Sequence, residues 1–156
     1  MKILLINSEY PPIGGGAGNA SAHLARCLGS FGHEVTILTS SYKDLPAREA
    51  HGPVTILRVP ALRRSMDRSS ALEQVSFILA ASLRAFNLIR QTKPDVTLAF
   101  FGVPSGVVAW LLKKLYRIPY IVSLRGGDVP GFRPYDFKVY HQLIGPFLHR
   151  IWREAS

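Results

Sequence analysis

The chain of 156 residues carries 19 Lys and Arg against 10 Asp and Glu, a formal net charge of +9, and 47% of its residues are hydrophobic. This composition excludes an intrinsically disordered polyelectrolyte, and the length fits one domain that buries a substantial core. The single cysteine, Cys27, excludes an intrachain disulfide and a cysteine-rich zinc module, and it favours a reducing compartment.

Strand and helix patterns alternate in the first sixty residues. The apolar run over 2–7 is typical of a strand buried on both faces, and it ends in a glycine-rich turn. Strands are also predicted over 34–39 and 54–59, with a loop over 40–53 between them. The helix that follows the glycine-rich turn ends before Gly32, which is placed to cap it. Its predicted buried stripe consists of Ala20, His23, Leu24, Cys27, Leu28 and Phe31.

The alternation continues in the second half of the chain. A last helical pattern begins at Tyr140, and Gly145-Pro146 is expected to kink it. The elements predicted before it are a helix over 70–92, a strand over 96–101, a helix over 104–116 and a strand over 120–124. The predicted buried stripe of the first of these helices is Leu72, Val75, Leu79, Leu83, Phe86 and Ile89 or Arg90.

These elements predict an α/β fold, a Rossmann-like doubly wound parallel sheet with helices on both faces. With the strands numbered along the chain, the expected order is 3-2-1-4-5, and the glycine-rich turn should face the segment after Phe101. The chain ends inside an amphipathic pattern without a stop signal, so residues 1–156 are expected to be one domain of a longer protein.

The hydrophobic runs predict neither a signal peptide nor a membrane-spanning helix. Residues 3–6 are fewer than the roughly 7–15 apolar residues of a signal-peptide core. The longest uncharged stretch, 96–112, is near the lower limit of about 17 residues for a spanning helix, and Gly102, Pro104 and Gly106 interrupt it.

The glycine-rich turn after the first strand is the first candidate site. Residues Gly14–Gly16 allow backbone N–H groups at a helix N-terminus to approach an anion. Asn19 and Ser21 break a dinucleotide fingerprint, the second strand ends without the acid that holds a ribose, and the lysine of a P-loop is missing. The alternative is a turn whose glycines only allow tight packing.

The loop Arg125–Asp128 is the second candidate, because it follows the last predicted strand at the edge where open α/β sheets bind ligands. Arg125 can hold a phosphate or carboxylate through paired N–H donors, and Asp128 can orient a hydroxyl or accept a proton. The alternative is that the two residues pair and brace a glycine turn.

The spacing of the histidines and the placement of the basic residues disfavour some classes of function and favour others. The five histidines show no metal-ligand spacing and no Gly-x-Ser-x-Gly elbow occurs, which disfavours metalloenzymes and hydrolases; His23 is expected to be partly buried. Basic residues on the predicted helices or at their ends, with three more in the polar stretch over 63–68, lack a nucleic-acid-binding motif and favour an anionic membrane surface. The alternatives are a solvated face and charge that a further domain balances. The basic residues are Arg63, Arg64, Arg68, Arg84, Arg90, Lys93, Lys113, Lys114 and Arg117.

Four motifs stand in order along the chain: KILLI with YPPIGGG at 2–16, LGSFGHEVTILT at 28–39, KPDV with RIPYIV at 93–122, and RGGDV at 125–129. Each motif alone is weak. Together they resemble, in order and spacing, the N-terminal domain of the family 4 glycosyltransferases of the GT-B type, and they cover most of residues 1–131.

The resemblance implies a cytoplasmic, two-domain hexosyltransferase that acts with retention and without a metal or other cofactor. This domain would hold a sugar or lipid-linked acceptor of the cell envelope or a polysaccharide, at the inner face of the membrane. A C-terminal domain would hold most of the nucleotide-sugar, so this chain alone is expected to be inactive. The family's usual histidine is replaced by Arg125, a permanent cation that cannot do what an imidazole does.

Site residues are assigned on this basis. Those expected to approach the donor diphosphate are Gly14, Gly15 and Gly16; those for the acceptor are Asn19, Gly126 and Gly127; and the catalytic candidates are Arg125 and Asp128. Two other functions stay open: a nucleotide-dependent oxidoreductase domain and a non-catalytic module that binds anions or membranes. A second α/β pattern over roughly 150–200 further residues would favour the transferase.

Overall fold

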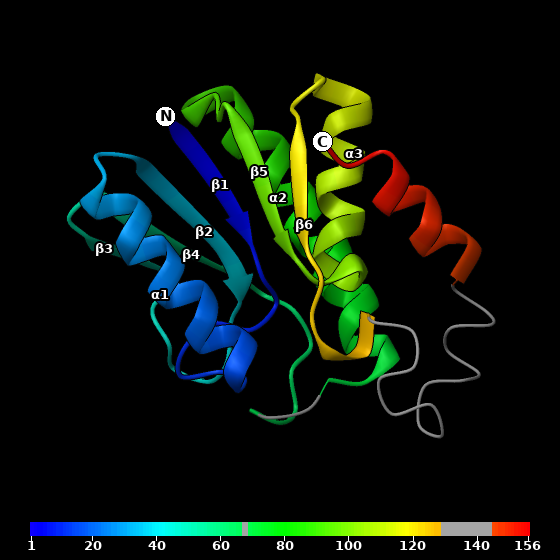
Figure 1. Ribbon diagram of the computed structural model, residues 1–156. Coiled ribbons are helices and arrows are strands. Elements are labelled where there is room, and N and C mark those ends of the chain that lie inside the picture. The colour runs from blue at the N-terminus through cyan, green and yellow to red at the C-terminus, as the bar shows by residue number, and fades with distance from the viewer. Residues whose placement is uncertain (67–68, 129–144) are drawn as a thin grey trace.

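One six-stranded sheet lies between layers of helices in the computed structural model, which describes residues 1–66, 69–128 and 145–156 (Figure 1). The strands are β1 (Lys2–Ile6), β2 (Glu34–Ser40), β3 (Arg48–His51), β4 (Val54–Val59), β5 (Val96–Phe100) and β6 (Tyr120–Ser123). Their order is β3-β4-β2-β1-β5-β6. The five parallel strands β4-β2-β1-β5-β6 confirm the predicted order.

The edge strand β3 corrects the sequence prediction in two respects. Residues 40–53 are not all loop, and the sheet is not purely parallel, because β3 runs antiparallel to β4 with Glu49 opposite Ile56. The chain reverses at Gly52, whose φ of +58° is costly for other residues. A short polar strand at a sheet edge lacks the apolar pattern that identifies the inner strands.

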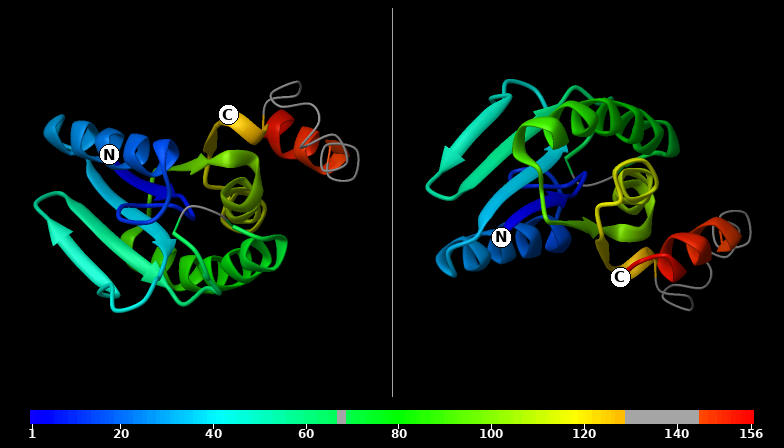
Figure 2. Two further views of the ribbon diagram at one scale, coloured as in Figure 1. Left: turned by 90° about the horizontal axis from the view of Figure 1, so that it is seen from below. Right: turned by 90° about the horizontal axis from the view of Figure 1, so that it is seen from above.

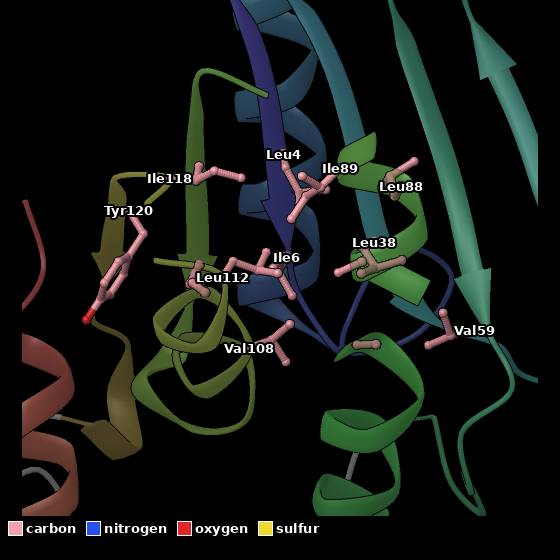
Figure 3. Packing of buried hydrophobic residues seen from close by; sticks show 14 of the residues in the cluster. Leu4, Ile6, Leu38, Val59, Leu88, Ile89, Val108, Leu112, Ile118 and Tyr120 are labelled. Atoms are coloured by element: carbon pink, nitrogen blue, oxygen red, sulfur yellow. The ribbon is translucent and has the colours of Figure 1, made fainter. Parts of the chain in front are cut away.

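Helices cover both faces of the sheet (Figure 2). They are α1 (Gly16–Ser30), α2 (Ala71–Thr92) and α3 (Val107–Tyr116). Side chains alternate along β1, so Ile3 and Leu5 pack on the face covered by α1, whereas Leu4 and Ile6 pack against α2 and α3 (Figure 3). Helices on both faces of a largely parallel sheet confirm the doubly wound, Rossmann-like fold.

Small residues bring α1 onto the sheet, and only part of the predicted stripe, Ala20, Leu24 and Leu28, packs against the core beside them. Phe31 is 77% exposed, and His23, expected to be partly buried, is exposed as well. A Cβ on Gly29 would lie 2.9 Å from Cγ of Pro53, so a larger residue there would push the helix away. The buried residues of α1 are Gly18, Ser21, Ala25 and Gly29.

A capping box begins α2, in which the Glu73 N–H donates to the Ser70 hydroxyl and the Ser70 N–H donates to the Glu73 carboxylate. The helix has two apolar faces, and most of the predicted stripe faces outward; only Phe86 and Ile89 of it pack against the core. Periodicity alone does not say which apolar face meets the sheet. The outward stripe is Leu72, Val75, Leu79 and Leu83, and the inward one is Phe77, Ala81, Ala85 and Leu88.

By length and composition α2 could cross a membrane, and it is the one helix of the described ranges that could, with a mean hydropathy of 1.3 in its most apolar part. In this structure it packs on the sheet as a core helix does, with Phe77 only 1% exposed.

The chain is helical again over residues 145–153, beside α3 and β6 (Figure 1). Leu148 and Ile151 are buried, and the Tyr120 hydroxyl donates to the Ile151 carbonyl over 2.5 Å. The Ser156 N–H donates to the carbonyl of Tyr120 over 2.8 Å. The predicted start of this helix, near Tyr140, lies outside the described residues.

One carboxylate fastens this last helix to α3. Glu154 accepts from Nε1 of Trp110 over 2.8 Å and pairs with Nζ of Lys114 at 2.7 Å, while Lys113 donates to the Glu154 carbonyl over 2.5 Å. The bond from Lys114, followed by those from Trp110 and Arg150, lowers the pKa of Glu154 to about 2. Lys113 and Lys114 therefore stabilise the contact between α3 and the last helix.

Substitutions on the inward and outward faces of α2 test how this helix is oriented on the sheet. Phe77→Ala should lower the free energy of unfolding by about 3–5 kcal/mol, because it leaves a cavity against the sheet. Leu79→Ala, two residues away on the outward stripe, should change it by less than about 0.5 kcal/mol. Urea titrations followed by circular dichroism measure both; a larger loss for Leu79→Ala would mean that the helix is rotated.

Candidate functional site

The carboxyl ends of β1, β5 and β6 meet at one edge of the sheet. β1 and β5 are hydrogen-bonded neighbours, yet the chain leaves β1 for α1 on one face and β5 for α3 on the other (Figure 2). Open α/β sheets bind ligands at such a reversal. Three segments lie at this edge: the glycine-rich turn, the irregular turn η1 (Phe101–Gly106) and the short turn η2 (Gly126–Asp128).

The glycine-rich turn leaves the N-terminus of α1 open. Gly14 has a φ of +85°, and its N–H donates to the Met66 carbonyl over 2.7 Å. Gly15 and Gly16 are exposed, and no atom lies within 4 Å of the place where a Cβ on either would be. No side chain caps this end of α1, so the N–H groups of its first turn stay available to an anion.

A carboxylate and an arginine lie beneath this turn. Burial raises the pKa of Glu9, while Arg63 and the N–H of Gly15 act in the opposite direction. Nη2 of Arg63 lies 3.9 Å from Oε1 of Glu9, and the Arg63 side chain is only 2% exposed. Arg63 therefore offsets the negative charge of Glu9 near the open helix end, and it does not belong to the basic outer surface that the sequence predicts.

Asn7, at the end of β1, shapes the turn and was not among the predicted site residues. Its side chain is fully buried: Nδ2 donates to the Ser21 hydroxyl over 3.0 Å and to the Ala17 carbonyl over 3.3 Å. Oδ1 accepts from the Glu9 N–H over 3.1 Å. A polar residue directly after an apolar strand is the signal by which it could have been found.

Asp128 joins the loop after β6 to the turn after β5. Its carboxylate is 2% exposed and accepts from the Gly102 N–H at 3.1 Å to each oxygen and from the Arg125 N–H at 3.2 Å. The Arg125 guanidinium lies over the Phe100 ring, 4.9 Å from its centre, and Nε donates to the Ser123 hydroxyl over 3.1 Å. Asp128 thus braces this edge through backbone N–H groups.

The acceptor candidates do not come together. Asn19 is exposed on α1 and lines a hollow with Tyr10 and Arg26, whereas Gly126 lies beyond β6, with β1 and β5 between the two elements. Within residues 1–66, 69–128 and 145–156, no three His, Cys, Asp or Glu side chains gather as metal ligands.

The fold and its switch-point edge define the class: an N-terminal half of a GT-B protein. The chain belongs to the glycosyl transferase 4-like domain family, which matches residues 15–156. Solved structures agree on the fold. The sucrose-phosphate synthase of Thermosynechococcus elongatus gives a TM-score of 0.68 at 16% identity, over 94% of this chain and 39% of that chain.

Two further likenesses are informative. The catalytic domain of starch synthase IV from Arabidopsis thaliana, solved with ADP and acarbose, gives a TM-score of 0.61 at 17% identity, over 83% of this chain and 34% of that one. TuaC of Bacillus subtilis, named as a candidate glycosyltransferase of teichuronic acid biosynthesis, is 26% identical over 182 residues. That match covers 100% of this chain and 46% of TuaC, so the chain spans about half the length of this relative.

Two glycines of the turn should respond differently to a methyl group. Gly18→Ala should lower the free energy of unfolding by about 1–3 kcal/mol, because its Cβ would lie 2.8 Å from the Ile13 carbonyl oxygen. Gly16→Ala should leave stability unchanged or slightly raised, since the space is open and alanine favours helices. Urea denaturation compares them; equal losses would show that Gly16 is also a packing glycine.

Proposed function

We propose that the chain is the acceptor-side domain of a retaining glycosyltransferase, which transfers a hexosyl group from a nucleotide-sugar to a cell-envelope or polysaccharide acceptor. The N-terminus of α1, which is open at Gly16 and carries no side-chain cap, carries the proposal in a chain of a glycosyltransferase family. The ADP bound to starch synthase IV supports a nucleotide donor, and the name of TuaC supports an envelope polysaccharide.

The donor diphosphate would lie over Gly14–Gly16, on the backbone N–H groups of the first turn of α1 that begins at Gly16, with Gly14 supplying the positive φ that the turn needs. Arg125 would hold a phosphate through paired, charge-assisted hydrogen bonds, and as a permanent cation it would not transfer a proton. The bonds of Asp128 favour a positioning role for it over proton transfer. Gly126 and Gly127 would leave room for the acceptor beside this loop.

Guanidinium and N–H groups would then stabilise the departing diphosphate without a metal ion. The rest of the donor site would lie in a second domain, because the chain spans 46% of TuaC. We therefore expect the transferase to need both halves and the chain alone to be inactive.

Arg125 provides the test of this proposal in the full-length enzyme. Arg125→Ala should lower kcat/KM about tenfold to a hundredfold, the effect of losing roughly 1.5–3 kcal/mol from a charged hydrogen bond. The melting temperature should stay nearly unchanged. Transfer from a radiolabelled nucleotide-sugar and thermal denaturation supply the two readings.

Arg48→Ala is the matched control, since Arg48 is an exposed arginine on β3, far from the loop after β6. It should leave both quantities as in the wild type. If Arg125→Ala lowers the melting temperature while the folded enzyme keeps normal kinetics, Arg125 only braces the loop and its assignment to the site is wrong.

A second proposal is that the protein lies in the cytoplasm with the outer face of α2 on an anionic membrane. The exposed fractions along the outward stripe are 74% for Leu72, 52% for Val75, 62% for Leu79 and 67% for Leu83. Arg84 and Arg90 of the same helix are exposed. Apolar and basic side chains on one helix suit the headgroup region, where each basic residue contributes about 1 kcal/mol.

Vesicle co-sedimentation tests the membrane proposal. Binding to phosphatidylglycerol vesicles should fall sharply between low and physiological salt, because exposed charges are then screened over roughly 8–10 Å. Leu79→Glu should abolish binding, whereas Leu115→Glu should not; Leu115 is also 62% exposed but lies on α3. Equal binding to neutral and anionic vesicles would remove the electrostatic basis of the proposal.

A further inference from the structure

A groove of about 810 Å³ lies between α1 and the hairpin of β3 and β4. Figure 2 shows the two elements that line it: α1 lies over one face of the sheet, and the hairpin extends beside it. The volume is that of a typical small-molecule site, about 300–1,000 Å³. Its lining residues from α1 are Asn19, Ala22, His23 and Arg26, those from the hairpin are Glu49, His51, Val54, Ile56 and Arg58, and Tyr10 and Pro11 complete it.

The helical repeat of α1 and the side-chain alternation of the strands bring the lining residues together in the groove. On α1, positions 19, 22, 23 and 26 share one side of the helix, next to the side that contacts the sheet. On β4, positions 54, 56 and 58 alternate onto the face that α1 covers. The antiparallel register sets Glu49 opposite Ile56 and His51 opposite Val54, so these two side chains join the same face.

The floor of the groove is apolar, and its walls carry polar and charged side chains. Val54 and Ile56 lie in the core cluster of this face together with Tyr10. Arg58 is buried and held by Glu49 and by the Pro46 carbonyl at 3.0 Å, and its Nε has no hydrogen-bond partner. That Nε is enclosed by the protein, so Arg58 shapes the wall of the groove and does not present a free donor to it.

Arg26 supplies the positive charge that no carboxylate of the groove offsets. Glu49, the one acidic residue of the lining, pairs with Arg58 and lies 3.2 Å from Nε2 of His51. Among the described residues, the Arg26 guanidinium contacts Nδ1 of His23 at 3.4 Å. An exposed arginine above an apolar floor can bind a carboxylate with two parallel hydrogen bonds.

We propose that this groove binds a carboxylated saccharide, the part of the acceptor chain remote from the reacting sugar. The sugar rings lie between α1 and the hairpin, against the exposed side chains of Asn19, His23 and His51, and a ring carboxylate pairs with Arg26. This inference rests on the proposed function and specifies its substrate class. Tyr10 and Pro11 belong to the same connection as Gly14–Gly16, so a chain in the groove leads toward the edge at which β1 ends.

Binding of trigalacturonate, with maltotriose as the neutral comparison, tests the proposal by isothermal titration calorimetry at low salt. The wild-type protein should bind trigalacturonate more tightly than maltotriose. Arg26→Gln should weaken trigalacturonate binding about tenfold and leave maltotriose unchanged, because only the charged hydrogen bond is lost. Arg48→Gln is the matched control; its position on β3 alternates with Glu49 and so points to the opposite face, and binding should be unaffected.

Ala22→Phe gives a second variant without a change of charge. Its ring should fill the groove from the exposed side of α1 and abolish binding of both saccharides, while the circular dichroism spectrum stays that of the wild type. The proposal is overturned if the wild type binds neither saccharide, if it binds both equally, or if Arg26→Gln and Ala22→Phe bind as the wild type does.

Transfer activity separates this inference from the function on which it rests. Failure of saccharide binding in a full-length enzyme that still transfers sugar from its nucleotide-sugar overturns the groove and leaves the transferase intact. Groove-dependent binding of trigalacturonate in a protein that transfers no sugar overturns the transferase and leaves a carboxylated-saccharide site.

Discussion

The buried amide of Asn7 is the contact on which the arrangement of this domain depends. It joins the first residue after β1 to the first turns of α1, through Ser21 and Ala17, and it holds the backbone of Glu9. Because a buried amide must keep its partners, the chain between β1 and α1 has little freedom. The absence of a side chain at Gly18 lets the helix come this close.

That close approach has two results on opposite sides of α1. At its N-terminus, the turn passes over Glu9 and Arg63 and leaves the first N–H groups of the helix uncovered. Along its flank, the helix contacts the hairpin at Gly29, beside Pro53 and Val54, and a groove with Arg26 on one wall stays open. The open N-terminus of α1 and the groove beside it therefore both depend on the small residues at the contact between α1 and the sheet.

The sequence predicts the parallel strands, their order and the helices between them, because buried apolar runs and glycine turns are local signals. It does not predict β3, whose polar residues are stabilised by pairing with β4 rather than by burial. It also assigns most of the wrong face to α2 and only part of the right one to α1. On α1, Leu24 and Leu28 pack against the core as predicted, but the closest contact is made by glycine, serine and alanine, which carry no hydrophobic signal; on α2 two apolar faces compete. For the candidate site, the glycine turn and the loop at Arg125 are local motifs, whereas Asn7 and the groove require knowledge of which elements meet.

The last helix has a consequence for how the protein behaves at high concentration. β6 is the final strand of its side of the sheet, and such a strand exposes a row of N–H and C=O groups that can pair with another molecule. The Ser156 N–H occupies the carbonyl of Tyr120, and the hydroxyl of the same tyrosine is bonded to Ile151. At the opposite margin, β3 is short and carries Arg48, Glu49 and His51. A packed helix thus protects one edge of the sheet, and charged side chains protect the other. Both features oppose pairing of edge strands between molecules.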